Sequence, residues 1–136
     1  MRTIYLLLLI FAASAAFAQK DHTGVKSKQV KSLEKEEMKT YYLVFLKKGP
    51  KRDQDSAAAA EIQKGHMAHL TKMYNEGKMD LAGPMMEEGD LRGICVYNVG
   101  SKEEAVKLAE SDPAVTSGRL KAEVHAWYSQ KGAKLR

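Results

Sequence analysis

The sequence GHMAHLTKMYNEGKMDLAGP, residues 65–84, contains the end of a helix, a glycine that can cap it and the start of a strand. Gly77 follows a polar turn, at the place where a helix C-terminal cap is expected. Residues 79–85 then have the composition of a strand, interrupted by Gly83 and Pro84. This stretch therefore predicts a helix that leads directly into a strand of the same domain.

Two histidines on this helix give it a chemical as well as a structural interest. On a helical wheel, His66 and His69 fall in the same narrow arc as Ile62 and Met73. Both imidazoles are therefore predicted to face whatever the helix packs against. An imidazole removed from water needs a hydrogen-bond partner, a metal ion or a ligand.

Outward from this stretch, the chain shows four strand-like and two main helix-like segments. The segment TYYLVFL, residues 40–46, is apolar on both alternating faces, which is typical of a central strand covered from both sides. Asp55 or Ser56 is suited to begin the first helix, and Ser101 with Glu104 forms a capping box for the second. The predicted elements are a strand at 40–46, a helix from 55 or 56 to 77, strands at 79–85 and 92–99, a helix from 101 to 110, a helical turn at 113–118 and a strand at 120–128.

This order of elements predicts an α+β protein with the ferredoxin-like βαββαβ split unit, an antiparallel sheet with helices on one face only. The first strand is nevertheless apolar on both faces, and Trp127 shares a face with Glu123 and His125. The helix-free face therefore needs a partner. A homodimer with its two sheets packed face to face meets that need, whereas a monomer leaves the face in water.

The N-terminus predicts export. Arg2, an apolar core at 4–11 and a small-residue stretch ending at Ala18 are typical of a secretory signal peptide, residues 1–18, cleaved after Ala18. The rival interpretation, a membrane anchor, requires a longer apolar run of roughly 20 residues. We therefore expect a secreted or periplasmic protein with no stable membrane anchor.

The remaining chain divides into three parts: a polar, flexible linker at 19–38, a folded domain at 39–130 and a basic tail at 131–136. The domain carries equal numbers of basic and acidic residues, so the formal net charge of +5 belongs to the ends of the chain. A nucleic-acid partner is not expected from that balance. Cys95 is the only cysteine, so no internal disulfide can form, and its apolar neighbours predict an inert buried thiol.

Between Tyr41 and Tyr128 the chain resembles the YCII-related family. The resemblance rests on the aromatic-rich first strand, on a mid-helix histidine followed by the GK-x-x-x-AGP strand at 77–84, and on the DP-x-V-x-x-G element at 112–118. It implies a dimeric α/β barrel built from ferredoxin-like domains. It also implies a histidine and aspartate active-site pair, which by motif position are His66 and Asp112, and at least one relative acts on a chlorinated hydroquinone. The signal peptide and linker depart from typical cytoplasmic relatives.

We therefore expect a small-molecule enzyme in which His66 moves a proton on a small cyclic or aromatic organic substrate and Asp112 orients it, with no cofactor. His69, Gly83 and Pro84 are expected to contribute to substrate binding. The alternative is a non-catalytic small-molecule-binding or interaction domain, in which His66 is a satisfied core histidine.

Each of the other residues also has a structural interpretation. Asp112 is suited to cap the helical turn that starts at Pro113, and Asp80 is the alternative carboxylate for His66. His66 and His69 together could hold a metal ion only with a third ligand in space, for which Asp80, Asp112 and His125 are the candidates; no metal site is expected.

Overall fold

A computed structural model describes residues 37–135; the predicted signal peptide at 1–18 and nearly all of the predicted linker at 19–38 lie outside these residues. The first strand begins at Met38, two residues before its predicted start, and the last strand continues to Gln130. The elements are β1 (Met38–Lys48), α2 (Ser56–Asn75), β2 (Met79–Pro84), β3 (Leu91–Tyr97), α3 (Lys102–Glu110), α4 (Pro113–Thr116) and β4 (Leu120–Gln130).

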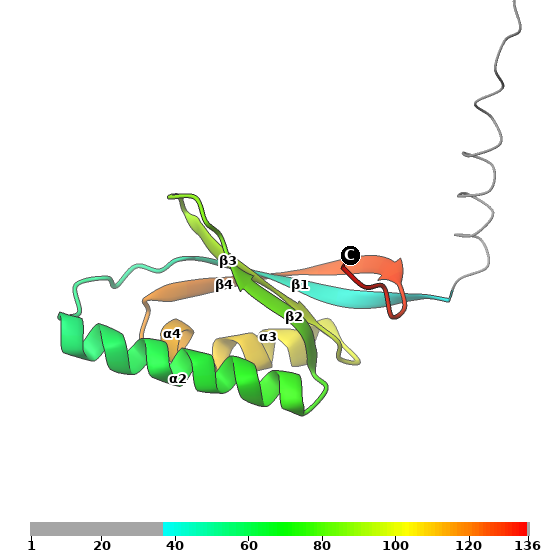
Figure 1. Ribbon diagram of the computed structural model, residues 1–136, viewed down its shortest axis with the longest axis horizontal. Coiled ribbons are helices and arrows are strands. Elements are labelled where there is room, and N and C mark those ends of the chain that lie inside the picture. The colour runs from blue at the N-terminus through cyan, green and yellow to red at the C-terminus, as the bar shows by residue number, and fades with distance from the viewer. Residues whose placement is uncertain (1–36, 136) are drawn as a thin grey trace, which may run out of the picture. The chain divides into compact units, whose positions relative to one another are not determined.

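The four strands form one antiparallel sheet in the order β2-β3-β1-β4, with β1 in the interior. Helices α2, α3 and α4 all lie on the same face of this sheet (Figure 1). The predicted α+β fold with the ferredoxin-like split unit is therefore confirmed. Within residues 37–135 no helix has both the length and the apolar character needed to cross a membrane.

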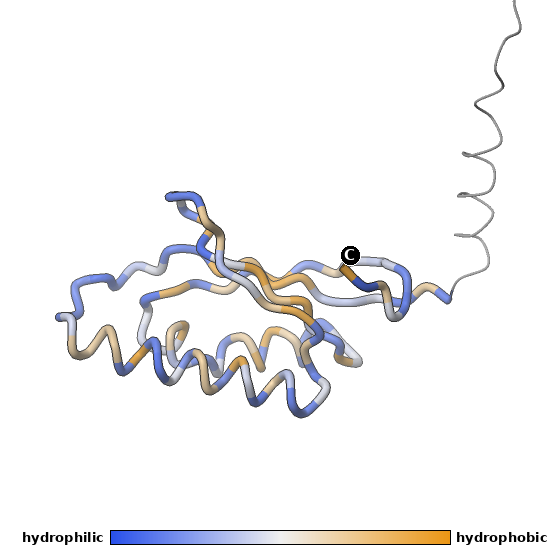
Figure 2. Tube along the Cα trace, in the orientation of Figure 1, coloured by the Kyte–Doolittle hydropathy of each residue, from blue (hydrophilic) through white to orange (hydrophobic). Residues whose placement is uncertain are grey.

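The alternation of β1 divides its apolar side chains between the two faces of the sheet. Tyr42, Val44 and Leu46 are buried beneath the helices, where they form one core with residues of α2, α3 and β3. Figure 2 shows the same concentration of hydrophobic residues along the middle of the sheet. The core consists of Tyr42, Val44, Leu46, Met73, Met79, Cys95, Tyr97, Ala105 and Ala109.

The helix ends follow the predicted capping residues. The Asp55 carboxylate accepts from the Ala58 backbone N–H at 2.8 Å, and Gly77 adopts a φ of 68° just after α2. At α3, the Ser101 hydroxyl accepts from the Glu104 N–H at 3.1 Å. The return bond of this capping box differs from the usual pattern, because the Glu104 carboxylate accepts from Gly100 N–H at 3.3 Å.

The helix-free face of the sheet is apolar along its centre. Leu43 and Phe45 of β1 lie on this face, and Tyr41 lies across from Trp127 of β4 with ring centroids 6.2 Å apart. Trp127 keeps 42% of its surface exposed. A salt bridge from Lys47 to Glu123, 2.5 Å long, borders the apolar centre. The arrangement on which the dimer prediction depends is therefore present in the fold.

Candidate functional site

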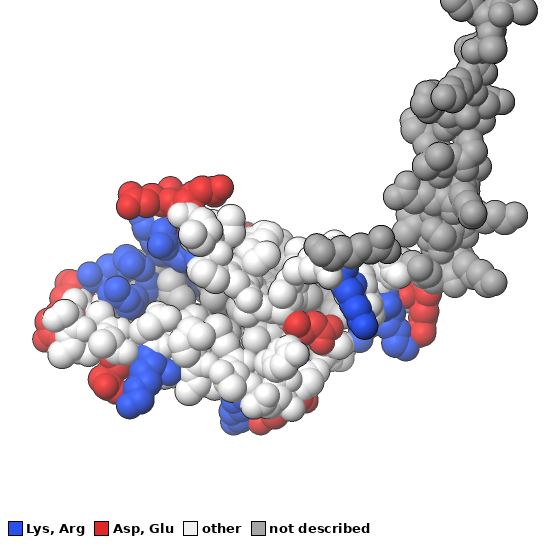
Figure 3. Space-filling view, viewed as in Figure 1, with Lys and Arg blue, Asp and Glu red and all other residues white. Residues whose placement is uncertain are grey.

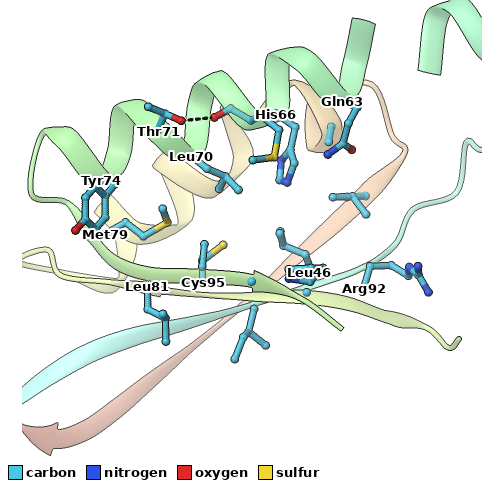
Figure 4. Close-up of a pocket in the computed structure, with 18 of the residues that line it drawn as sticks. Leu46, Gln63, His66, Leu70, Thr71, Tyr74, Met79, Leu81, Arg92 and Cys95 are labelled. Atoms are coloured by element: carbon cyan, nitrogen blue, oxygen red, sulfur yellow. Dashed lines mark hydrogen bonds between the residues drawn. The ribbon is translucent and has the colours of Figure 1, made fainter. Parts of the chain in front are cut away.

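A pocket of about 880 Å³ lies between α2 and the β2–β3 side of the sheet. Its wall is mainly apolar, with Leu46 from β1, Leu70 from α2 and Ala82 from β2 among the residues that line it. His66 projects into this space from α2 (Figure 4). The predicted pocket between the first helix and the sheet therefore exists, and its walls are suited to an organic ligand with an apolar body.

His66 is paired with Asp112. The Nδ1 atom of His66 lies 2.6 Å from Oδ2 of Asp112, and the two residues are only 8% and 2% exposed. A carboxylate oxygen can only accept, so Nδ1 carries the proton and donates it to this bond. In the neutral ring, Nε2 is consequently the basic nitrogen, with a free lone pair.

The surroundings of Nε2 show whether His66 faces a pocket or is buried in the core. Among residues 37–135, His66 makes no side-chain hydrogen bond other than the one through Nδ1. In this part of the chain, every side-chain nitrogen or oxygen that is fully buried has a hydrogen-bond partner. An atom without a partner, such as Nε2, must therefore be at least partly accessible. Nε2 is thus not fully buried, and His66 is one of the residues that line the pocket.

Asp112 performs two tasks with two different oxygens. Its Oδ1 accepts from the backbone N–H of Ala114 at 2.8 Å and so caps α4, as predicted, while Oδ2 accepts from His66. Capping fixes the carboxylate on rigid backbone, and the fixed carboxylate orients the imidazole. The structural and the orienting roles are therefore compatible.

Gly65 allows the two elements of this pair to approach. A Cβ atom at Gly65 would lie 3.1 Å from Cβ and Cγ of Pro113, the first residue of α4. Since glycine has no such atom, α2 passes close to α4, and the next residue along the helix, His66, reaches Asp112. A glycine inside a helix reduces helix stability by roughly 1 kcal/mol relative to alanine, so its position at this contact has a clear physical reason.

We expect Gly65→Val to destabilise the fold by about 1–3 kcal/mol, because the added methyl groups overpack the contact with Pro113. Urea denaturation measures this change. Ala60→Val is the matched control, since Ala60 is exposed on the same helix and that variant changes helix propensity without the contact. A Gly65→Val protein as stable as the control would contradict this explanation.

His69 lies beside Tyr97, and its predicted part in substrate binding stays a prediction. It is absent from the pocket wall, and its Nε2 is 3.5 Å from the hydroxyl of Tyr97. Desolvation lowers the pKa of His69, with a smaller opposing effect from the Asp112 charge. The reason for the difference from His66 is angular, because residues three apart on a helix are separated by about 60° and need not face the same space. His69 is thus half-buried and in contact with Tyr97.

The other predicted residues are placed as follows. Gly83 and Pro84 both line the pocket. Asp80, the alternative carboxylate, accepts from Asn98 Nδ2 at 3.1 and 3.2 Å, so Asp112 is the carboxylate that contacts His66. Cys95 is a buried thiol whose pKa is raised to about 12 by burial. Within residues 37–135, no three histidine, cysteine or acidic side chains are grouped to hold a metal ion.

Sequence reasoning did not identify three arginines that also line the pocket, Arg52, Arg92 and Arg119. Arg92 is the extra residue of a β-bulge, because the consecutive β1 residues Leu46 and Lys47 pair with Gly93 and Leu91. A bulge changes the direction of a side chain. No sequence motif marks this bulge, since it depends on the register between two strands far apart in the chain.

The comparison with protein families identifies the kind of domain. The family model described as YCII-related domain matches residues 40–127, more than half of the chain. Among solved structures, the chain is similar to 5-chloro-2-hydroxyhydroquinone dehydrochlorinase (TftG) from Burkholderia phenoliruptrix AC1100 in complex with 2,5-dihydroxybenzoquinone. That match has 21% identity and a TM-score of 0.49, and it covers 64% of this chain and 92% of that chain. No protein with a curated description matches the chain.

Proposed function

We propose that this chain, which belongs to the YCII-related family, is an enzyme that moves a proton on a small cyclic or aromatic organic molecule. The observation that carries the proposal is the geometry of His66: Nδ1 is held by the Asp112 carboxylate, while the residue lines a mostly apolar pocket from which Nε2 can be reached. A purely structural histidine would have both ring nitrogens satisfied by the protein.

The proposed chemistry is general acid–base catalysis. Nε2 accepts a proton from a substrate hydroxyl or an acidic C–H group that lies within about 2.6–3.2 Å, and the bond electrons remain on the substrate. The imidazolium that forms is stabilised by Asp112, whose buried carboxylate faces Nδ1. Nε2 then returns the proton to a different atom of the substrate or to a leaving group. The cycle needs no cofactor.

A chemical probe tests the accessibility of Nε2 without knowledge of the substrate. Diethyl pyrocarbonate acylates an imidazole nitrogen that lacks a proton, and peptide mass spectrometry gives the rate at each histidine. We expect His66, although 8% exposed, to react while the protein is still folded. A His66 that reacts only after unfolding is a sealed core residue, and the catalytic role would then be wrong.

The assembly that we propose is a homodimer with the helix-free sheet faces in contact. It is supported by the apolar centre of that face, which includes Leu43, Phe45 and the partly exposed Trp127. Leu43→Asp places a charge in this centre, and we expect the variant to sediment as a monomer. Lys102→Asp, on the exposed surface of α3, is the control. A wild-type monomer at micromolar concentration would contradict the proposal.

We also propose that the enzyme is secreted or periplasmic. The support comes from the cationic start, apolar core and small-residue stretch of residues 1–18. A mature protein that begins at Gln19 in the exported fraction is the expected result. An N-terminus at Met1 in that fraction would contradict cleavage.

A further inference from the structure

We propose that the ligand of this pocket carries a carboxylate, which the arginines at one end of the pocket bind. We call Arg52, Arg92 and Arg119 the arginine end. They come from three different places, the loop after β1, the bulge in β3 and the residue before β4. Figure 4 shows Arg92 toward the same end of the pocket as His66 and Gln63, away from Tyr74 and Met79.

The backbone around the arginine end is held by hydrogen bonds between these segments. Gly49 N–H donates to the Arg119 carbonyl at 3.0 Å, and Lys51 N–H donates to the Gly118 carbonyl at 2.9 Å. A Cβ atom at Gly49 would lie 2.1 Å from the Gly118 carbonyl oxygen, so only glycine permits this approach. The loop that carries Arg52 is therefore fixed against the start of β4, which places two of the three guanidinium groups before any ligand arrives.

The guanidinium groups keep most of their hydrogen-bonding capacity. Each makes one hydrogen bond through Nη1: Arg52 to the Arg119 carbonyl at 3.0 Å, Arg119 to the Gln54 side chain at 3.0 Å and Arg92 to the Glu87 carbonyl at 3.4 Å. No salt bridge within residues 37–135 involves an arginine. A guanidinium has five N–H donors, so most of them remain for an anion.

The positive charge at the arginine end does not come from an excess of basic residues in the domain. The domain from 39 to 130 is balanced, yet Asp80 is the only acidic residue among those that line the pocket, and it is bound to Asn98. Figure 3 shows Lys and Arg side chains gathered beneath the acidic tip of the β2–β3 hairpin. The pocket therefore presents three positive charges at one end of an otherwise mainly apolar wall.

A mainly apolar wall with arginines at one end favours a carboxylate attached to a ring over other anions. A planar carboxylate matches the fork of N–H donors, and the apolar wall formed by residues such as Leu46, Leu70 and Ala82 suits the face of a ring. A hydroxyl-rich sugar phosphate would leave its hydroxyl groups against apolar side chains, at a cost in affinity. The carboxylate fixes one end of the ligand, so the ring lies where Nε2 of His66 can reach it.

Isothermal titration of the full chain with 4-hydroxybenzoate and its neutral isostere 4-hydroxybenzamide tests the inference. We expect the benzoate to bind about tenfold or more tightly than the amide, because only the benzoate makes charge-assisted bonds. Arg92→Gln should remove most of this difference, and Arg119→Gln should do the same. Arg92 makes only one long hydrogen bond, so its variant is expected to fold; thermal melting checks this.

Lys64→Gln is the matched control, because it removes one positive charge from an exposed position on α2 that is outside the pocket wall. The inference would be overturned if the two compounds bound equally or if neither bound at millimolar concentration. It would also be overturned if Lys64→Gln lost the benzoate preference to the same extent, or if inorganic phosphate bound as tightly as the benzoate. The inference rests on the proposed function only for the position of the reacting atom. A benzoate preference that survives in a protein without turnover would contradict the enzyme but not the arginine end.

Discussion

His66→Asn is expected to lower kcat for the substrate of this pocket by about 10²–10⁴-fold, the usual contribution of a general acid–base group. The asparagine amide nitrogen can occupy the position of Nδ1 and keep the hydrogen bond to Asp112, but the variant has no counterpart of Nε2. The substitution therefore removes the proposed base while leaving the buried carboxylate paired. Initial-rate kinetics and urea denaturation on the same samples measure the two effects separately.

His125→Asn provides the matched comparison, since His125 lies on the opposite face of the sheet from the pocket and hydrogen-bonds to Glu123. We expect it to retain kcat. His66→Ala is informative as a second variant because it leaves the Asp112 oxygen without a partner, so it should lose stability as well as activity. A His66→Asn protein with wild-type kcat would rule out His66 as the base.

Asp112→Asn is expected to retain the fold and to lose activity. Asparagine caps helices about as well as aspartate, so the bond from Ala114 N–H should persist. Its amide nitrogen would then face Nδ1 of His66 and donate to it, which forces the ring proton onto Nε2. The equivalent exchange in a Ser-His-Asp triad reduces kcat by about 10⁴-fold, and we expect a loss of about 10²–10⁴-fold here.

Asp112→Ala separates the capping role from the orienting role. This variant loses the cap and leaves the buried Nδ1–H without an acceptor, so we expect a loss of about 2–4 kcal/mol in the free energy of unfolding. Asp112→Asn should lose less than about 1 kcal/mol, because both hydrogen bonds find a partner. If the two variants had equal stability and equal kcat, Asp112 would be neither cap nor orienting group.

The fold was predictable because its signals are local. The alternation of TYYLVFL, the Asp55 and Ser101 caps and Gly77 each specify a short segment, and the order of segments then leaves few topologies. The pairing of His66 with Asp112 was reached through motif position in a family resemblance. The contact that makes it geometrically feasible, Gly65 against Pro113, joins two helices and has no signature in either one alone.

The remaining features of the site depend on long-range geometry. The placement of His69 outside the pocket depends on how α2 is rotated against the sheet, which helical spacing constrains only within a broad arc. The arginine end depends on the bulge at Arg92 and on the approach of Gly49 to Gly118, both of which appear only when strands are paired. A balanced domain charge gave no indication that three arginines share one pocket.

The proton position on His66 is the most direct test of the account, and long-range ¹H–¹⁵N correlation NMR measures it for both ring nitrogens. We expect the proton of the bond to Asp112 to lie on Nδ1, and addition of 4-hydroxybenzoate should shift the Nε2 resonance much more than that of Nδ1. A proton on Nε2 with none on Nδ1 in the free protein, or a bound ligand that leaves both His66 nitrogen resonances unchanged, would contradict this arrangement.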